Sequence, residues 1–437
     1  MRAPSRRLLI WLGAATVASV GLFVFPGAWP LLLVADTLLV LAALVDWIGA
    51  PGPASLTAER IAPLRLGALE PYTIRVRIAS RSRIPLRIRL RDTPPPELAA
   101  ATEELSGVVS ANGERIWEYA VRPTSRGCFA WGPINLRYRS LLGLWDFGLT
   151  VPAPGEVRVY PSLADLKRYH LLAAANRLES IGMRKVRPRG SALEFESLRE
   201  YTFGDDLRLL DWKATARRGR LIVRQQQAER NQTVILLLDC GRLMNAREGA
   251  VTKLDHAVNA ALLLAHVALA RNDRVGLAVF SHKVHAWLAP RGHTSQNRLI
   301  AEALYDLRGD YTESDHGRCL EVVAAQHPKR SLLVVLTDFV DATTAADMVA
   351  QLQHAGRRHL ILFAALKDAF LERLAAVSPE NAGEGFRMAA AVDLLRERQA
   401  VLEKVRRFGA FVIDAEPGAI APPLVNQFVE IVSRGLI

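Results

Sequence analysis

Aspartates that follow strongly apolar runs are the residues of this 437-residue sequence best placed to do chemistry. The run Val234-Ile-Leu-Leu-Leu238 leads into Asp239, and a second run at residues 332–336 leads into Thr337 and Asp338. Continuous apolar runs of this length are typical of parallel strands buried on both faces. Such sheets bind ligands beyond the carboxyl ends of their strands, so Asp239 and Asp338 mark the edge where a ligand would bind.

The elements that must position these aspartates form a doubly wound α/β domain, expected at residues 231–437. A long helix with Val258, Leu262, Ala265 and Leu269 on one face follows the first strand. Further strands are expected at residues 274–280, 284–288, 332–336, 359–364 and 410–413, and further helices at residues 295–307, 320–326, 343–355, 388–407 and 424–433. Alternating strands and helices of these lengths predict a parallel sheet covered on both faces.

This domain resembles the von Willebrand factor A fold, whose metal-ion-dependent adhesion site uses Asp-x-Ser-x-Ser after the first strand and a later Thr and Asp. The sequence reads Asp239-Cys-Gly241-Arg-Leu243, so both serine positions lack the hydroxyl that would ligate Mg²⁺. The resemblance implies that Asp239, Thr312 and Asp338 correspond to the remaining ligands of this site. We expect no cofactor, with weak Mg²⁺ binding as the alternative, because both aspartates can instead cap turns or helix N-termini.

The most distinctive stretch precedes this domain, at residues 198–221. Its notable residues are Tyr201, Gly204, Asp205, Asp206, Arg208, Asp211, Trp212, Lys213 and Arg217. We expect the aspartates to bind turn amides or neighbouring bases, and Trp212 to anchor the segment by packing. Exposed ion pairs contribute only ~0–1 kcal/mol each, so stability alone does not explain this charge. The stretch is either a brace that joins two domains or a contact site for another protein.

The same stretch closely resembles the core motif of the bacterial family known as domain of unknown function fifty-eight, in which it precedes a von Willebrand A-like domain. Gly143-Leu144, Val159-Tyr160-Pro161 and Leu424-Val-Asn426-Gln-Phe428 also fit, so the resemblance extends from about residue 120 to the end. The family is typically membrane-tethered and often encoded beside MoxR-type AAA+ ATPases. That resemblance implies a MoxR-type ATPase as partner and a role in assembling a complex.

The first fifty residues predict two transmembrane helices. Residues 8–25 carry no charge, and residues 31–48 are interrupted only by Asp36 and Asp46. Each run is long enough to cross a hydrocarbon core of ~30 Å at ~1.5 Å per residue. The breaker Pro26-Gly-Ala-Trp-Pro30 joins them, which indicates a tight hairpin with Asp36 near its interfacial turn. A signal peptide is the alternative, but no A-x-A-like cleavage site separates the two runs.

Basic residues flank this hairpin on one side, with Arg2, Arg6 and Arg7 before it and Arg60 and Arg65 after it. The positive-inside rule then places the N-terminus and the soluble domains in the cytoplasm, on the inner membrane of a bacterium. The net charge of +12 suits an anionic membrane surface or nucleic acid. Three scattered cysteines indicate neither a disulfide framework nor a zinc site.

Residues 55–160 predict a β-sandwich-like domain of about seven strands. Tyr72, Ile74, Val76 and Ile78 alternate with polar residues, and residues 86–91 alternate apolar side chains with arginines. Strands with one apolar and one charged face are typical of an antiparallel sheet with one solvated side. Residues 161–230 then form a linker that contains the signature stretch.

The function predicted from this organisation is that of a non-catalytic, membrane-tethered scaffold for protein interaction, of unknown oligomeric state. An enzyme with an uncharacterised hydrolytic activity at the strand ends is one alternative. It lacks support, because the sequence contains no G-x-x-x-x-G-K-[ST], G-x-G-x-x-G, H-E-x-x-H or G-x-S-x-G motif. Nucleic-acid binding through the basic residues of 213–224 is the other alternative, although no reading module accompanies them.

Overall fold

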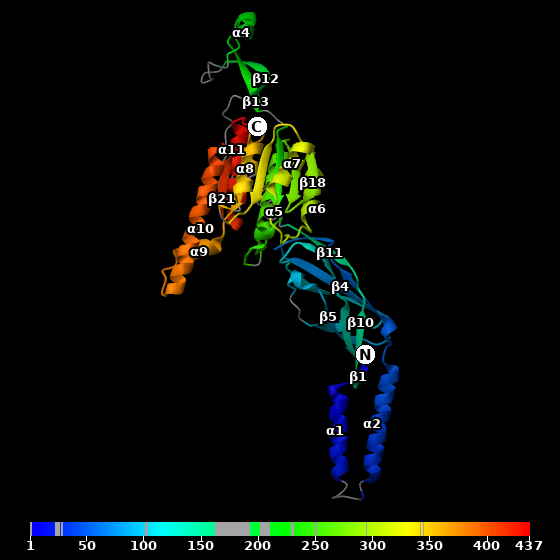
Figure 1. The fold of residues 1–437 in the computed structure, drawn as a ribbon. Coiled ribbons are helices and arrows are strands. Elements are labelled where there is room, and N and C mark those ends of the chain that lie inside the picture. The colour runs from blue at the N-terminus through cyan, green and yellow to red at the C-terminus, as the bar shows by residue number, and fades with distance from the viewer. Residues whose placement is uncertain are drawn as a thin grey trace. The chain divides into compact units, whose positions relative to one another are not determined.

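The computed structural model describes residues 2–21, 27, 29–100, 104–161, 193–201, 210–228, 231–249, 251–293, 295–340, 342–343 and 345–437. These residues divide into two compact units, Met1–Tyr160 and Pro161–Ile437. Figure 1 shows helices and strands in both units. Residues 162–192 of the expected linker lie outside the described residues.

The first unit is rich in short strands. They are β1 (Arg2–Pro4), β2 (Leu56–Ile61), β3 (Arg65–Gly67), β4 (Tyr72–Ser80), β5 (Leu86–Asp92), β6 (Leu105–Val109), β7 (Glu114–Val121), β8 (Gly127–Ala130), β9 (Ile134–Arg139), β10 (Trp145–Val151) and β11 (Glu156–Tyr160). They form sheets in the orders β1-β10-β9-β5-β6, β2-β4-β7 and β3-β11-β8. Ten of them, β2 to β11, lie within residues 55–160, which is more than the seven or so expected, because β3 and β8 are too short to show a period of two.

Alternation of side chains explains why these strands form. In β4, Ile74, Val76 and Ile78 are buried while Thr73 and Arg75 are exposed. The arginine face of β4 is solvated and paired, since the Arg75 Nε lies 2.7 Å from a Glu118 carboxylate oxygen. The period-two pattern in the sequence therefore predicted the buried face correctly.

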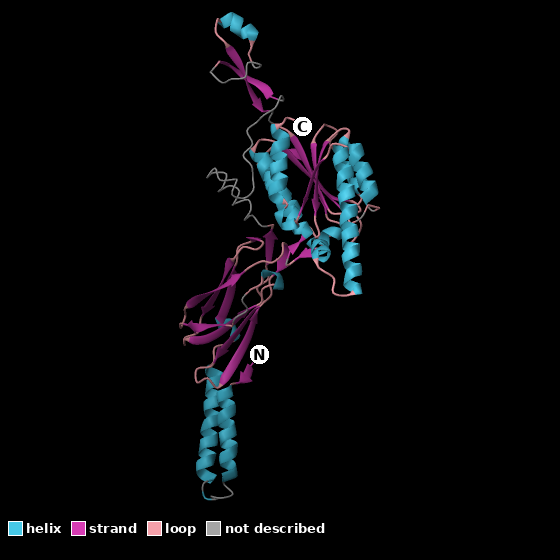
Figure 2. Ribbon diagram, turned by 90° about the vertical axis from the view of Figure 1, so that its left-hand side faces the viewer, coloured by secondary structure: helices cyan, strands magenta, loops and turns pink. Residues whose placement is uncertain are grey.

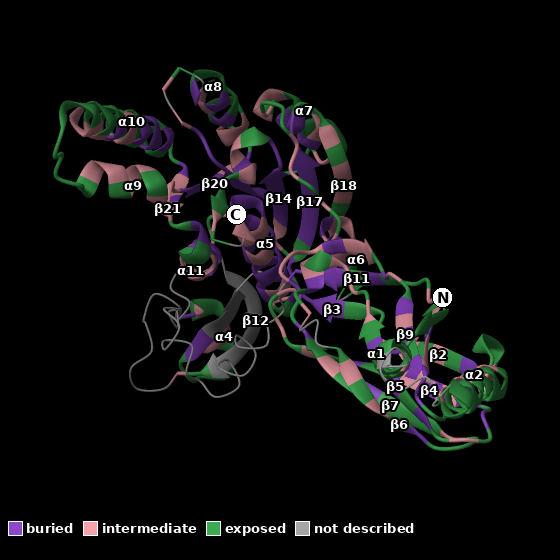
Figure 3. Ribbon diagram, turned by 90° about the horizontal axis from the view of Figure 1, so that it is seen from below, coloured by how far each residue is buried: buried purple, intermediate pink, exposed green. Residues whose placement is uncertain are grey.

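The second unit contains a six-stranded sheet in the order β18-β17-β14-β19-β20-β21. Its strands are β14 (Thr233–Asp239), β17 (Arg274–Phe280), β18 (Val284–Arg291), β19 (Leu332–Thr337), β20 (Leu360–Leu366) and β21 (Phe411–Ala415). All neighbours are parallel except β17 and β18, which form a hairpin. Figure 3 shows β14 and β17 buried at the centre of the unit.

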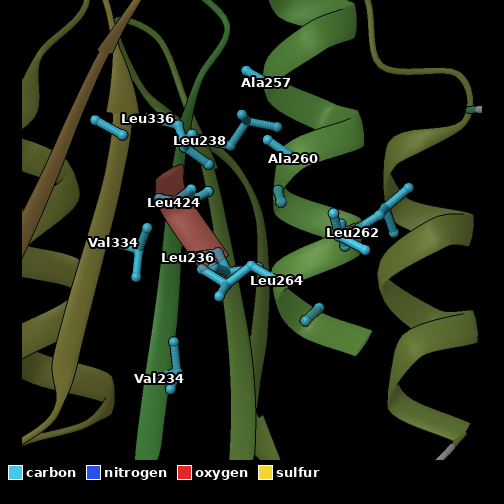
Figure 4. Close-up of a cluster of buried hydrophobic side chains, with 14 of the residues drawn as sticks. Val234, Leu236, Leu238, Ala257, Ala260, Leu262, Leu264, Val334, Leu336 and Leu424 are labelled. Atoms are coloured by element: carbon cyan, nitrogen blue, oxygen red, sulfur yellow. The ribbon is translucent and has the colours of Figure 1, made fainter. Parts of the chain in front are cut away.

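Helices cover both faces of this sheet (Figure 2). They are α5 (Lys253–Ala270), α6 (Ser295–Leu304), α7 (His316–Gln326), α8 (Ala345–Gly356), α9 (Ala369–Ala376), α10 (Ala382–Arg407) and α11 (Ala421–Ser433). Buried residues of α5, α6 and α11 form one core with Val234, Leu236 and Leu238 of β14. Buried residues of α7, α8 and α10 form a second core on the other face, with Ile235 and Leu237 of the same strand. Figure 4 shows the first core, between β14 and α5.

Most strands and helices of this unit lie within a few residues of the ranges expected from the sequence. Helix α10 begins at Ala382, six residues before the expected start, because the Asn381 side chain caps it by accepting from the Glu384 N–H. Helix α9 was not anticipated, and its N-cap is Asp368. A short hairpin, β15 (Arg247–Glu248) and β16 (Val251–Thr252), precedes α5.

A separate antiparallel hairpin carries the signature stretch. Its strands are β12 (Leu193–Glu200) and β13 (Ile222–Ala228), and helix α4 (Trp212–Arg218) lies in the connection between them. The Tyr201 N–H donates to the Leu221 carbonyl, so the pairing of the two arms continues beyond the strands.

Two helices precede β2 in the first unit, namely α1 (Arg6–Gly21) and α2 (Trp29–Gly49). Their apolar side chains face outward, and Val17, Leu31 and Ile48 are more than 70% exposed. Among the described residues, α2 is the one helix long and apolar enough to span a membrane. The expected first span continues beyond α1 into residues 22–25, which lie outside the described residues.

A buried carboxylate joins α2 to the strand-rich part of the same unit. Asp46, in the last turn of α2, is only 3% exposed. It accepts hydrogen bonds from the Ser140 hydroxyl, from the Leu142 N–H at 2.8 Å and from the Leu144 N–H at 3.0 Å. The indole N–H of Trp145 donates to the Ala43 carbonyl at 2.8 Å. Asp46, one of only two charges in the second apolar run, therefore fixes the loop between β9 and β10.

Replacing this carboxylate should loosen the joint. We predict that Asp46→Ala destabilises the full-length protein by about 3 kcal/mol, because three donors lose their acceptor. Thermal melts in detergent, followed by tryptophan fluorescence, measure this effect. The matched control is Asp146→Ala, which removes only the exposed ion pair with Arg139 and should change stability by under ~1 kcal/mol. Equal shifts for the two variants would contradict the prediction.

Candidate functional site

The end of β14 places Asp239 in a closed set of hydrogen bonds. The carboxylate is 2% exposed and accepts from the Gly241 N–H at 2.7 Å. The hydroxyls of Ser314 and Thr337 each donate to it at 2.5 Å, Ser314 to Oδ1 and Thr337 to Oδ2. Both carboxylate oxygens are therefore satisfied by protein donors.

Ser314 takes the space of the first missing serine. A Cβ added at Gly241 would lie 2.1 Å from the Ser314 Oγ and 3.1 Å from the Asp239 Oδ1. Any side chain at position 241 would therefore displace the Ser314 hydroxyl. Sequence reasoning noted the missing hydroxyl at position 241, but it could not find its replacement, because Ser314 comes from a loop far along the chain.

The end of β19 places Asp338 between two buried cations. The Lys253 ammonium lies 2.7 Å from its Oδ2, and the Arg398 guanidinium lies 2.7 Å from its Oδ1. The Phe339 N–H also donates to the carboxylate at 2.8 Å. A second carboxylate, Asp414 of β21, accepts from Arg398 at 3.0 Å. Two acids and two bases thus neutralise one another, and all four side chains are at most 8% exposed.

The sequence pattern did not reveal either cation. Lys253 is the first residue of α5, where the helix dipole disfavours a positive charge, so its pairing with Asp338 compensates for this position. Arg398 is buried in α10, and its guanidinium stacks 4.6 Å from the Phe339 ring centroid. Burial alone would lower the pKa of Arg398, but attraction to Asp338 and Asp414 raises it, so the side chain stays charged.

The three residues predicted as remnants of a cation site do not share one contact set. Asp239 and Asp338 lie at the ends of neighbouring strands, whereas the Thr312 hydroxyl lies 3.0 Å from the His282 Nδ1. The Thr312 carbonyl, at 2.9 Å, accepts from the Arg242 N–H. Because Lys253 and Arg398 already neutralise Asp338, the donors present do not fit a hard divalent cation such as Mg²⁺.

His316 is a further buried polar group at this edge. It is in the first turn of α7, and its Nε2 lies 3.2 Å from the Thr337 hydroxyl and 4.0 Å from the Asp239 Oδ2. Burial lowers the pKa of His316 although Asp239 is near, so the neutral imidazole is the stable form at pH 7. His316 therefore adds an uncharged polar contact, through the Thr337 hydroxyl, to the hydrogen bonds around Asp239.

A pocket of about 380 Å³ opens beside Asp338. Its charged lining carries both signs and consists of Arg242, Lys253, Asp338, Lys367, Asp368 and Arg398, among others. Lys367 is paired with Glu372 at 2.9 Å, so its charge is also compensated.

The signature stretch presents a different kind of surface. Asp211 caps α4, because its side chain accepts from the Ala214 N–H at 2.9 Å. Trp212 is 68% exposed, so our expectation that it anchors the segment by packing is wrong for this structure. Trp212 begins α4, none of whose residues is buried, whereas Leu210 and Ile222 beside it are buried.

Three basic residues share this helix with Trp212, namely Lys213, Arg217 and Arg218, and all are exposed. Neighbouring Arg220 pairs with Glu200 at 2.8 Å, with both side chains more than 60% exposed. Tyr201 is half-buried at the base of the hairpin. The other predicted signature residues, Gly204, Asp205, Asp206 and Arg208, lie outside the described residues.

These features define a class of protein with an N-terminal helix apolar enough to span a membrane and two units of mixed helix and sheet. The family model described as "Protein of unknown function DUF58" matches residues 197–404. This match covers just under half of the chain and confirms the family that the signature stretch indicated for these residues.

The other comparisons give little further information. No curated protein matches the chain. A solved structure of the conserved hypothetical protein BatB from Bacteroides thetaiotaomicron is 13% identical, with a TM-score of 0.30, over 46% of this chain and 99% of that one. The CARDB domain of a Pyrococcus furiosus protein in complex with di-metal ions is 16% identical, with a TM-score of 0.17, over 24% of this chain and 86% of that one.

Breaking the buried charge network should destabilise the second unit strongly. We predict that Lys253→Met costs about 3–5 kcal/mol, because Asp338 keeps a buried charge with one partner fewer. For a unit of this size the melting temperature should fall by roughly 10 °C, measured by tryptophan fluorescence in detergent. The matched control is Lys283→Met, at an exposed lysine in the turn after β17, and it should change the melting temperature by under about 2 °C. A small shift for Lys253→Met would show that the network is not stabilising.

Proposed function

We propose that this protein is a non-catalytic, membrane-tethered scaffold that binds a partner protein. We further propose that the partner is a MoxR-type AAA+ ATPase and that the pair assembles or matures an envelope or membrane complex. The second unit would then act as a von Willebrand factor A-like interaction domain. Membership of the family supports the choice of partner, and the exposed surface of α4 supports a role in binding.

The observation that carries the proposal is the exposure of Trp212 among basic side chains. A tryptophan that is 68% exposed leaves a large apolar ring in water, which is unfavourable without a partner. Tryptophan and arginine are the residues most enriched among those that dominate protein interfaces. Lys213, Arg217 and Arg218 add a positive rim, so the partner surface should carry an apolar pocket with acidic residues around it.

The polar groups at the sheet edge support a non-catalytic role. General bases and nucleophiles need a free lone pair within reach of a substrate. Asp239 and Asp338 instead accept hydrogen bonds at both oxygens, and burial raises the pKa of the Cys240 thiol to about 12. These contacts support a structural role for the edge.

The tether is proposed to be a hairpin of α1 and α2 that crosses the inner membrane twice. Strand β1 pairs with β10, with Arg2 opposite Phe147, and β1 directly precedes α1. Since the end of α2 is also bonded to the β9–β10 loop through Asp46, both ends of the hairpin meet the same sheet. Arginines on this side support a cytoplasmic location for both soluble units.

Loss of Trp212 should weaken partner capture. We predict that Trp212→Ala reduces co-purification of an ATPase from detergent-solubilised membranes at least tenfold, because the anchor of the interface is removed. Quantitative mass spectrometry of the eluates measures the recovery. Phe386→Ala is the matched control, since Phe386 is 78% exposed on α10, and it should leave recovery unchanged.

Reversing charges tests the rim separately. The double variant Arg217→Glu, Arg218→Glu should lower ATPase recovery more at low salt than at high salt. At high salt, ions screen the repulsion between the new glutamates and the acidic residues proposed on the partner. If the unchanged protein recovers no ATPase, the proposal of an ATPase partner is wrong. If Trp212→Ala and Phe386→Ala recover equal amounts, the proposal that α4 is the contact site is wrong.

The orientation can be tested by fusion of a reporter to the C-terminus. We predict that a green fluorescent protein fused after Ile437 is fluorescent and that an alkaline phosphatase at the same position is inactive, because phosphatase folds only outside the cytoplasm. A fusion of each reporter after Gly27, between the two helices, is the control and should give the opposite pattern. An active phosphatase at the C-terminus would contradict a cytoplasmic location.

A further inference from the structure

Two histidines and an aspartate converge on the surface of the second unit, at a place that the proposed function does not use. His282 lies in the turn after β17, His285 lies in β18, and Asp310 lies in the loop between α6 and α7. One ligand atom from each lies within 4.8 Å of the other two. Their side chains are 47%, 30% and 27% exposed, so the cluster is open to solvent.

The spacing of these atoms matches that of ligands around one metal ion. The Asp310 Oδ2 lies 3.1 Å from the His282 Nδ1 and 3.8 Å from the His285 Nε2. Tetrahedral zinc with bonds of ~2.0–2.1 Å places its ligand atoms about 3.4 Å apart. The observed distances lie on either side of this value, so small side-chain rotations would complete the arrangement.

Neighbouring hydroxyls hold the ligands in place. The Ser281 hydroxyl, from a fully buried residue, donates to the Asp310 Oδ2 at 2.9 Å and lies 2.7 Å from the His285 Nε2. The Thr312 hydroxyl lies 3.0 Å from the His282 Nδ1. These hydroxyls contact the same ring nitrogens that would bind an ion, so they draw the three side chains together and an ion would replace them at those nitrogens.

The same contacts could also form a hydrogen-bonded cluster without an ion. The geometry favours a metal. Two imidazole nitrogens and one carboxylate oxygen, from three different segments of the chain, lie within 4.8 Å of one another at a place open to solvent.

We propose that His282, His285 and Asp310 form a binding site for a transition-metal ion of the zinc class, with one coordination position open to solvent. Two imidazoles and one carboxylate favour Zn²⁺ and its neighbours over Mg²⁺ or Ca²⁺, which prefer oxygen ligands. The site shares no ligand with Asp239 or Asp338. It is also independent of the proposed contact between α4 and a partner protein.

The test uses the untagged full-length protein in detergent, after treatment with a chelator. Isothermal titration with ZnCl₂ should show one Zn²⁺ per chain, and Co²⁺ should give the strong visible absorption of a tetrahedral site. His282→Ala and His285→Ala should each weaken Zn²⁺ binding at least tenfold. His354→Ala, at an exposed histidine on α8, is the matched control and should change binding less than twofold.

Two results would overturn the proposal. One is the absence of Zn²⁺ binding by the unchanged protein. The other is retention of the same affinity and the same Co²⁺ spectrum in the double variant His282→Ala, His285→Ala. Because both histidines are exposed, their replacement should leave the fold intact, and a melting curve for each variant checks this.

Discussion

The neutralisation of buried charge at the sheet edge is the constraint on which the second unit depends. Asp338 lies at the end of a fully buried strand, where an unpaired carboxylate would be very unfavourable. Lys253 from α5 and Arg398 from α10 reach it from two elements that are far apart in sequence, and Arg398 links it to Asp414 on β21. One set of four charges therefore fixes two helices and two strands, and any ligand at this edge has to fit around it.

Much of the fold could be predicted from the sequence, because its patterns are local. The apolar run before Asp239 could be recognised as a buried strand, and the alternation in β4 and β5 as a sheet with one solvated face. Strand β1 and helix α9 could not be recognised. The first has only three residues, and the second depends on a cap at Asp368 and on packing against α10.

The candidate sites were harder to predict, because their partners come together only in three dimensions. The loss of hydroxyls at Gly241 and Leu243 was evident, yet nothing in the sequence linked Ser314, Lys253 or Arg398 to the same edge. The closely spaced pair His282 and His285 was the one local signal of the surface cluster, and it gained meaning only when the loop carrying Asp310 was placed beside it. Exposure of Trp212 likewise depends on the turn of α4, which composition does not specify.

The pairing of β1 with β10 has a consequence for the order of assembly. Arg2 lies opposite Phe147, so β1 can join the edge of the five-stranded sheet only after β10 has been synthesised. Strand β1 therefore has no strand partner in this sheet while the intervening strands are being synthesised. Contacts so distant in sequence are slow to close, which makes the docking of this edge a late step in the maturation of the protein.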